Sequence, residues 1–480
     1  MESTAAMAAG LTYLRPEIAL LATAALGMFA HLFLKRHGAR IAGYVTLLGL
    51  LVAADIVFLT PLSPAAGFFG GSLTADRFAF YFTIIFLLAA AMSVGLAFRF
   101  FEVQGFEAGE FYYLLPLALI GMTAAVSSTD LIATYVAFEL FAIPSYILTG
   151  IFKKESRSSE ASVKYFFLGT LSSGIMLLGM ALVFGLTGET RYAEIARLLP
   201  GANARIALIG MILVFAGLAF KAALAPFQMW APDVYEGAPT PIVVFLATAS
   251  KAAAFAILIR LMVAVFAPFH ASWTQIFQFL AVVSMFWGNL AALVQTNIKR
   301  MMAYSSIAHA GYVAIGLAAW GEGASIAVLF YLVVYLFMNA AAFSLVLLVR
   351  KDDGFGESVD DLRGLARRSP LAAASVLVVL LALTGIPPTA GFLGKYLVFL
   401  AAADKGLILL VAAGALNSVI SLFYYFRIGR AMFMEDPAGE AGEKPAFPVL
   451  AVLVVSAAVL LVLGLAPSFL MNFAASAALK

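Results

Sequence analysis

The stretch FKAALAPFQMWAPD, residues 220–233, places two prolines and one lysine inside an otherwise apolar run. A second stretch of this kind, TGIPPTAGFLGKY at residues 384–396, combines adjacent prolines with one lysine. Proline interrupts the hydrogen bonding of a helix, and membrane helices tolerate such breaks where the freed backbone lines a polar path. Paired breaks in corresponding halves indicate an inverted-repeat transporter with its ion path at the breaks.

The composition around these stretches is that of a membrane protein. Of 480 residues, 64% are hydrophobic and only 11% charged, whereas a soluble domain is about half apolar and a quarter charged. A soluble enzyme is therefore excluded. Cysteine is absent, which excludes thiolate-bound zinc and iron–sulfur clusters in this chain. The four histidines are not spaced as metal ligands, and the net charge of +3 does not indicate nucleic acid.

The apolar runs predict an all-α polytopic membrane protein. A window of roughly 20 apolar residues, the length that crosses a bilayer, predicts about fourteen spans. These spans start near residues 17, 41, 78, 112, 130, 162, 204, 241, 272, 301, 324, 371, 404 and 447. The first is interpreted as a retained helix, because it lacks the basic segment and cleavage site of a signal peptide.

Lysine and arginine are unevenly divided between alternate loops, with about eighteen on one side and about seven on the other. The positive-inside rule therefore predicts that the richer loops are cytoplasmic and that both termini lie outside. The longest charged loop, residues 350–370, belongs to the cytoplasmic set. It is interpreted as a solvated connector or as a docking surface.

Four ionisable side chains are predicted deep inside the spans: Glu139, Lys221, Lys251 and Lys395. Placing each such charge at the centre of a membrane helix costs about 2.5–3.5 kcal/mol of insertion free energy. It is therefore retained only if it is paired, hydrated or required for function. One interpretation is structural, with Glu139 locked to a lysine across two helices. That pair would leave two lysines unexplained, and the alternative is a proton relay along the middle of the membrane.

A pair of glutamate and lysine has the properties of a proton switch. Burial away from water disfavours a charged lysine, whereas a neighbouring carboxylate favours it. Closing the pair keeps the proton on the lysine, and opening it releases the proton to a neighbour. A difference of about 4 kcal/mol between the two arrangements exceeds the roughly 2.3 kcal/mol needed to move one charge against 100 mV.

Lys164 is a further candidate for this relay. It follows the sequence SSE at residues 158–160, which resembles a helix N-cap. Lys164 is therefore interpreted either as an ordinary interfacial lysine or as the cytoplasmic feeder of Lys221.

Three further ionisable residues lie within or near the ends of spans. His309, in MAYSSIAHAGY at residues 302–312, has a side chain suited to relaying protons, but a buried histidine is often only a hydrogen-bonded core residue. Asp55 and Arg260 lie near the ends of their spans. Both are expected to extend toward the membrane interface.

Five segments in this order carry a family resemblance: FELFAIPSYILTG (138–150), SSEASVKYFFLG (158–169), FKAALAPFQMWAPDVYEGAPTP (220–241), MAYSSIAHAGY (302–312) and GIPPTAGFLGKY (385–396). Together they resemble the antiporter-like membrane subunits of respiratory complex I (NADH:quinone oxidoreductase), and among these the bacterial subunit N family, the counterpart of mitochondrial NADH dehydrogenase subunit 2. The wider family shares its fold with Mrp-type cation/proton antiporter subunits. The resemblance extends from about residue 100 to residue 430.

The resemblance implies fourteen helices with two inverted five-helix repeats. Helices 1–3 would occupy residues 1–111, the first repeat residues 112–267, the second repeat residues 268–434, and the last helix residues 435–480. It also implies that the glutamate of helix 5 and the lysines of helices 7, 8 and 12 are Glu139, Lys221, Lys251 and Lys395. Gln228 stands where family members commonly have histidine. A bridging water is expected to replace that proton carrier.

The function that the resemblance implies is proton translocation in the membrane arm of complex I, coupled to NADH oxidation and quinone reduction in other subunits. No nucleotide-binding motif occurs in the sequence. NADH, flavin, iron–sulfur clusters and quinone are therefore expected in partner subunits, and no redox centre is expected in this chain. The implied partners are a subunit M-like protein, small subunits like A, J and K, and the lipid bilayer of the bacterial inner membrane. A stand-alone or Mrp-type antiporter and a non-pumping scaffold are the alternatives.

Overall fold

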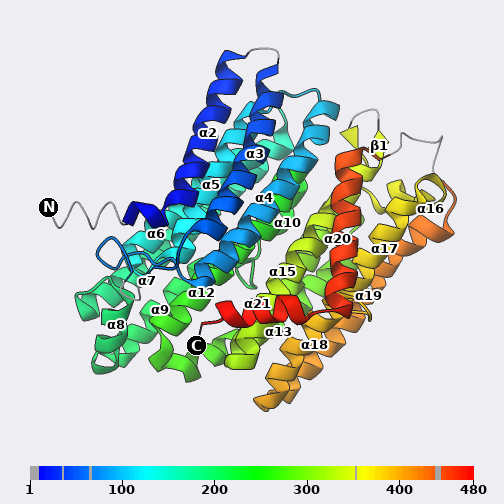
Figure 1. Cartoon of the computed structure of the whole chain (residues 1–480). Helices are drawn as coiled ribbons and strands as arrows, with labels where there is room; N and C mark the ends of the chain where they lie inside the picture. The colour runs from blue at the N-terminus through cyan, green and yellow to red at the C-terminus, as the bar shows by residue number, and fades with distance from the viewer. Residues whose placement is uncertain (1–9, 35–36, 64–66, 352–353, 438–444, 480) are drawn as a thin grey trace.

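The computed structural model describes residues 10–34, 37–63, 67–351, 354–437 and 445–479. Almost all of its regular structure is helical, and the long helices run side by side as one broad bundle (Figure 1). The predicted class, an all-α polytopic membrane protein, is confirmed.

In the described part of the first half of the chain, eleven α-helices are labelled, from α2 to α12. Their bounds are α2 (Arg15–Phe33), α3 (Gly38–Leu59), α4 (Arg77–Val103), α5 (Gly109–Ser127), α6 (Leu131–Thr149), α7 (Ser156–Thr187), α8 (Tyr192–Leu198), α9 (Ala204–Ala222), α10 (Trp230–Gly237), α11 (Thr240–Phe245) and α12 (Lys251–Ala264). A π-helical turn, Leu246–Ser250, joins α11 to α12, so these three segments form one continuous span.

The second half contains the remaining helices and one small hairpin. Their bounds are α13 (His270–Leu293), α14 (Ile298–Ala318), α15 (Glu322–Ser344), β1 (Arg350–Lys351), β2 (Gly354–Phe355), α16 (Leu365–Arg368), α17 (Pro370–Thr384), α18 (Ala390–Asp404), α19 (Ile408–Met434), α20 (Phe447–Leu465) and α21 (Ser468–Ala477). The two strands are antiparallel, with Arg350 opposite Phe355.

The number of membrane crossings agrees with the prediction once one broken span is recognised. Thirteen of the described helices are long and apolar enough to cross a membrane. The expected span near residue 371 is instead divided into α17 and α18, of 15 residues each, because the backbone breaks at residues 385–389. Taken as one crossing, this pair completes the fourteen. The other proline-rich stretch also breaks, between α9 and α10.

Polar side chains at the ends of loops start several of the spans. Asp76, Asp130, Asn203 and Asn297 each accept a hydrogen bond from the first turn of the helix that follows. These caps satisfy backbone N–H groups that have no partner inside the helix. The cap predicted at residues 158–160 is wrong. Helix α7 already begins at Ser156, and the Ser158 hydroxyl donates instead to the carbonyl oxygen of Thr149.

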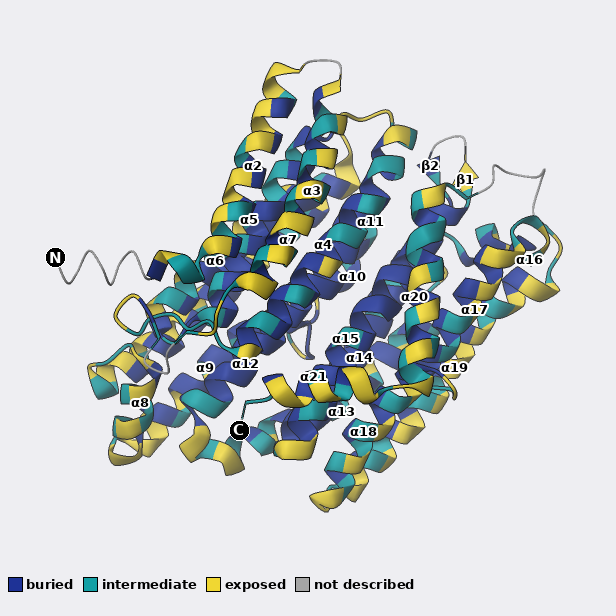
Figure 2. Ribbon diagram, viewed as in Figure 1, coloured by how far each residue is buried: buried dark blue, intermediate teal, exposed yellow. Residues whose placement is uncertain are grey.

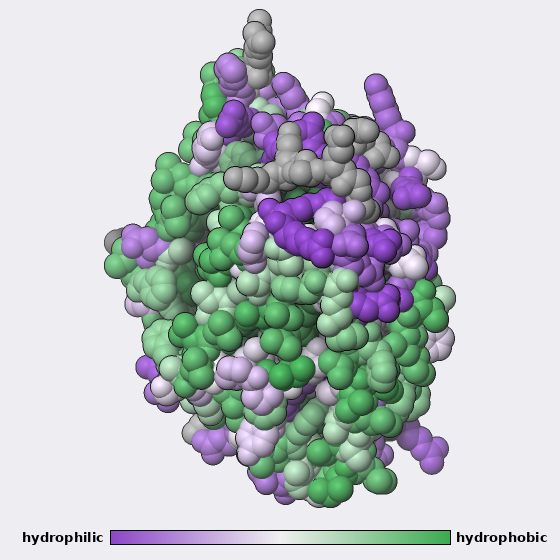
Figure 3. Space-filling view, turned by 90° about the vertical axis from the view of Figure 1, so that its right-hand side faces the viewer, coloured by the Kyte–Doolittle hydropathy of each residue, from purple (hydrophilic) through white to green (hydrophobic). Residues whose placement is uncertain are grey.

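Burial separates the central helices from the peripheral ones (Figure 2). The span at residues 240–264 is enclosed on all sides, and α14 and α15 are nearly so. The outer helices expose apolar side chains, and on α6 these form one stripe of Ile132, Val136, Leu140, Ile143 and Ile147. The face seen in Figure 3 is largely apolar, and its hydrophilic residues gather toward the end that carries β1 and α16 in Figure 1. Such an outer surface suits a bilayer and neighbouring membrane subunits.

The charged loop at residues 350–370 is folded back onto the bundle. The carboxylate of Glu357 accepts hydrogen bonds from Lys299 and Asn297, at 3.1 Å each, at the start of α14. Lys351 and Asp361 form a salt bridge within the loop at 2.6 Å. Residues 352 and 353 lie outside the described part of the chain. Both predicted roles, connector and docking surface, stay open.

Helix α21 was not predicted from the sequence. It lies across the lower end of the bundle, nearly perpendicular to α20 (Figure 1). The ring of Phe473 packs 4.7 Å from Tyr81 and 6.0 Å from Phe80, both on α4. The chain thus returns after its last span to contact the third.

Candidate functional site

The structure places the four predicted charges on separate helices of the bundle. Lys221, Lys251 and Lys395 are buried, with exposed fractions of 1%, 1% and 4%. Glu139, on α6, is partly exposed, but one of its carboxylate oxygens is buried and has no hydrogen-bond partner among the described residues. The burial predicted from the sequence is therefore confirmed for the three lysines.

Lys221 lies in the last turn of α9, just before the first break, and is surrounded by aromatic rings. Its Nζ has no hydrogen-bond partner in the described part of the chain. Four ring centroids lie within 6 Å of this nitrogen: Tyr165 at 4.7 Å, Tyr146 at 4.9 Å, Phe141 at 5.2 Å and Phe138 at 5.8 Å. We call these four rings the aromatic cage. A ring face attracts a cation but offers no lone pair that could hold its protons in place.

Glu139 is close enough to Lys221 for the two charges to interact, but the described residues contain no salt bridge between them. Glu139 lies between Phe138 and Phe141, whose rings belong to the aromatic cage. The pair that would lock two helices together is thus not closed in this structure. The proton switch between the two residues stays a prediction.

Gln228 lies within the first break, between α9 and α10. Its side chain is buried, and its Oε1 has no hydrogen-bond partner among the residues described. Buried amide oxygens are usually hydrogen-bonded, often to water. The water expected to bridge this position stays a prediction.

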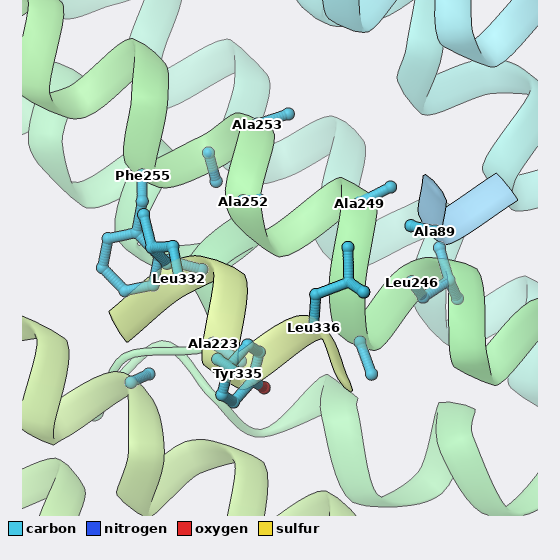
Figure 4. Close-up of a cluster of buried hydrophobic side chains, with 14 of the residues drawn as sticks. Ala89, Ala223, Leu246, Ala249, Ala252, Ala253, Phe255, Leu332, Tyr335 and Leu336 are labelled. Atoms are coloured by element: carbon cyan, nitrogen blue, oxygen red, sulfur yellow. The ribbon is translucent and has the colours of Figure 1, made fainter. Parts of the chain in front are cut away.

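Lys251 begins α12 directly after the π-helical turn. Its Nζ donates to the carbonyl oxygen of Ser306 at 2.9 Å and to the Ser306 hydroxyl at 3.1 Å. The ring of Tyr335 lies 5.6 Å from the same nitrogen. Figure 4 shows Tyr335 beside Leu332 and Leu336, in the apolar cluster that packs against this span. Single π-turns in a helix often occur at functional positions.

His309 lies on α14, one turn beyond Ser306, and joins a chain of hydroxyl groups. Its Nδ1 is 2.7 Å from the Tyr331 hydroxyl and its Nε2 is 3.3 Å from the Tyr425 hydroxyl. The Tyr425 hydroxyl also forms a hydrogen bond with the Ser305 hydroxyl at 2.5 Å. The histidine is close enough to Lys251 and Lys395 to interact electrostatically with both.

Lys395 lies on α18 but reaches back across the second break. Its Nζ donates to the carbonyl oxygens of Leu383 and Thr384, at 2.9 Å each, at the end of α17. These carbonyls carry the partial negative charge of a helix C-terminus, which favours a cation. The ring of Tyr312 lies 4.4 Å from the same nitrogen. A side chain in place of Gly391 would collide with the backbone of Ala382, so the two half-helices approach closely only with glycine there.

Lys164 forms two ion pairs rather than pointing freely toward Lys221. Its Nζ lies 2.7 Å from Asp233 and 2.8 Å from Glu160. Arg300 also bonds Asp233, at 2.8 Å, and Glu236, at 2.9 Å. The group of Lys164, Asp233, Glu236 and Arg300 joins α7, α10 and α14, and we call it the charged junction.

The expectation that Arg260 extends to the membrane interface is wrong. Its guanidinium is buried and makes two hydrogen bonds of 2.8 Å to the carboxylate of Asp76. The ring of Phe78 lies 4.9 Å from its central carbon. Arg260 ties the eighth span to the cap of α4, because a paired guanidinium is stable inside the protein. Asp55 is exposed on α3, and its extension toward the membrane interface stays a prediction.

Several residues of the site were not singled out from the sequence. Three tyrosines contact a predicted site residue: Tyr331, Tyr335 and Tyr425. Two more residues lie within the charged junction, Asp233 and Arg300. Of these residues, only the tyrosines could have been noticed in the sequence, because a hydroxyl group inside an apolar span is expected to have a hydrogen-bond partner. No group of His, Asp and Glu suited to a metal ion occurs among the described residues.

A helical bundle with two broken spans and buried lysines can be compared with known protein families. A family model described as NADH:quinone oxidoreductase/Mrp antiporter, TM, matches residues 128–421. The chain belongs to this family of antiporter-like membrane subunits.

The relatives narrow the assignment within that family. The chain is 39% identical to NADH-quinone oxidoreductase subunit N of Trichlorobacter lovleyi, over 97% of this chain and 96% of that protein. It is 41% identical to NADH-quinone oxidoreductase subunit N of Moorella thermoacetica, over 98% of both chains. A chain in respiratory complex I from Thermus thermophilus with bound aureothin superposes with a TM-score of 0.79 at 36% identity, covering 94% of this chain and 99% of that chain. The resemblance to the subunit N family is confirmed.

Proposed function

We propose that this chain translocates protons as a membrane-arm subunit of NADH:quinone oxidoreductase in the bacterial inner membrane. The observation that carries the proposal is the set of three fully buried lysines, each on a span of its own and each held in a polar or aromatic setting. Ionisable groups at this depth are costly, and their usual role in membrane proteins is to carry ions or protons.

In the first half, Glu139 and Lys221 act as the switch. With the carboxylate not bonded to the ammonium, the charged lysine is stabilised among the described residues by ring faces and by the nearby charge of Glu139. It therefore gives up its proton more readily than a salt-bridged lysine would. When the carboxylate of Glu139 closes against Lys221, it favours the charged lysine, which takes up a proton again. Lys164, in the charged junction, borders the path from the cytoplasm.

Lys251, on the last span of the first half, passes the proton on to His309 and Lys395 in the second half. The hydroxyls of Ser306, Ser305, Tyr425 and Tyr331 provide donors and acceptors around the histidine. Hydroxyl and imidazole groups can both accept and donate a proton, so they suit short transfers. Lys395 ends the series at the second broken span.

The wider arrangement follows from the same proposal. The two breaks mark two inverted repeats, residues 112–267 and 268–434, preceded by three helices in residues 1–111 and followed by residues 435–480. The uneven loop charges support both termini on the outer side. NADH oxidation and quinone reduction, with their flavin and iron–sulfur clusters, belong to partner subunits, and neighbouring membrane subunits like M, A, J and K cover the apolar outer faces.

The experiment is proton uptake by proteoliposomes that contain the complex with both Lys221→Ala and Lys395→Ala. The expected result is loss of NADH-driven acidification, and the matched control is Lys405→Ala, an exposed lysine after α18. Normal acidification by the double variant would contradict the proposal.

The family description also covers Mrp antiporters, which gives the alternative of a stand-alone cation/proton exchanger. Cation/proton exchange by the purified chain alone in liposomes would favour that alternative. A scaffold role predicts that charge-neutral variants impair assembly and leave the number of protons pumped per NADH unchanged.

A further inference from the structure

The charged junction holds one short helix from two directions. Helix α10 follows the first break and carries Asp233 in its first turn. The Asp233 carboxylate accepts a hydrogen bond from Lys164 on α7, at 2.7 Å, and another from Arg300 on α14, at 2.8 Å. Lys164 lies in the first proposed repeat and Arg300 in the second. A single carboxylate therefore links both halves of the molecule to the half-helix of the broken span.

The same half-helix forms one wall behind the aromatic cage. Trp230, its first residue, stacks on Tyr165 with ring centroids 4.6 Å apart and an interplanar angle of 16°. The indole N–H of Trp230 donates to the carbonyl oxygen of Phe220, the residue before Lys221, at 2.8 Å. Tyr165 is the cage ring closest to the Lys221 ammonium. A displacement of α10 would therefore move a ring of the cage.

Helix α10 has close packing on one side and charged partners on the other. A side chain in place of Gly237 would collide with the backbone of Arg157, so the end of α10 lies directly against α7. Beside it is a hollow of about 210 Å³, which is lined by Arg157, Glu160, Lys164, Asp233, Glu236 and Arg300. Because this hollow leaves space next to the helix, the ion pairs and not packing alone fix its position on that side.

We propose that Asp233 is a positioning residue for Lys221. Through α10, Trp230 and Tyr165 it sets the geometry of the aromatic cage, and through Arg300 it ties that geometry to α14, which carries Ser306 and His309. The proposal rests on the proposed function, in which Lys221 carries protons. It adds that the ion pairs of Asp233 decide how closely α10 covers the lysine.

The test measures how often α10 moves away from its packed position. The chain contains no cysteine, so Ala231→Cys introduces a single thiol into it. Ala231 is fully buried on α10, and a maleimide reacts there only when the half-helix opens. The rate of labelling is followed in the purified complex, on the band of this chain after electrophoresis, with and without Asp233→Asn.

The expected result is that Asp233→Asn speeds labelling by about threefold or more, because local opening becomes less costly, and lowers the number of protons pumped per NADH. Asp233→Glu keeps the charge and restores both quantities in large part. The matched control is Glu160→Gln, which removes the other carboxylate of Lys164 without touching α10. Its labelling rate stays that of the parent.

An unchanged labelling rate in the assembled Asp233→Asn complex overturns the proposal, whatever the pumping activity. If that variant does not assemble, Lys164→Gln is used, which removes one of the two ion pairs and leaves Arg300 in place. Faster labelling in Lys164→Gln supports the proposal, and an unchanged rate contradicts it. Failure of the proposed function would instead appear as normal pumping in the Lys221 variant, which this labelling experiment does not measure.

Discussion

The two broken spans hold their lysines in opposite ways. Lys221, before the first break, has four rings around its ammonium and no hydrogen-bond partner in the described structure. Lys395, after the second break, donates to two carbonyl oxygens at the end of α17. The break therefore serves two purposes. In the second half it exposes a helix terminus that stabilises a charge, and in the first half it brings α10 against an aromatic cage.

This difference suggests different tasks for the two lysines. An ammonium held by two carbonyls and a helix end keeps its proton more firmly than one held by ring faces. In the proposed function, Lys221 is thus the group whose charge depends on whether Glu139 closes against it. Lys395 is the group whose charge depends on fixed backbone. Four changes test this comparison, from the largest expected effect on pumping to the smallest.

The first change is Lys395→Met, which removes the proposed last proton carrier and puts an uncharged, unbranched side chain one atom shorter in its place. NADH-driven pumping is expected to fall by about tenfold or more, because a relay stops when one carrier is lost. Proton uptake and NADH oxidation are measured together in proteoliposomes, with Lys405→Met as the control. Unchanged pumping would remove Lys395 from the path.

The second change is Lys221→Met, for which the effect on pumping and the effect on the stability of the complex are expected to differ in size. Pumping is expected to fall as far as in Lys395→Met. Thermal unfolding of the complex is expected to differ, because Lys395→Met loses two charged hydrogen bonds, worth about 3–6 kcal/mol together, whereas Lys221→Met loses none. Equal losses of stability would contradict the distinction between cage and helix end.

The third change is Tyr425→Phe, which removes the hydroxyl between Ser305 and His309. A loss of about fivefold in pumping is expected, the effect of one hydrogen bond of about 1 kcal/mol in the transfer step. Tyr424→Phe is the matched control on the same helix, since its hydroxyl donates to Asn289 instead. A larger loss in Tyr424→Phe would place the path elsewhere.

The fourth change is Arg260→Leu, for which the smallest effect on pumping is expected. Removing the guanidinium leaves Asp76 without its partner and is expected to cost about 3 kcal/mol of stability. The melting temperature of the complex should fall while the number of protons pumped per NADH stays at the parent value. A reduced ratio at normal assembly would make this pair part of the proton path.

The membrane crossings and the buried lysines could be predicted from the sequence, because they depend on local composition. Runs of apolar residues define spans, and the adjacent prolines at residues 387 and 388 cannot continue a regular helix. The depth of Lys251 follows from its place along one helix. None of these inferences requires a contact between distant segments.

The partners of those lysines could not be predicted, because they come from other helices. Arg260 meets Asp76 across 184 positions of sequence, and its place near the end of a span alone suggested an interfacial side chain. The open arrangement of Glu139 and Lys221 depends on how α6 and α9 pack around the cage. The cap expected at residues 158–160 failed because the helix starts earlier, at Ser156.

The most direct test of the central claim is the number of protons pumped per NADH oxidised in Lys251→Met, since this lysine stands between the two halves of the series. The account predicts a ratio clearly below that of the parent complex in tightly sealed proteoliposomes. A ratio equal to that of the parent, in fully assembled complex, would contradict it.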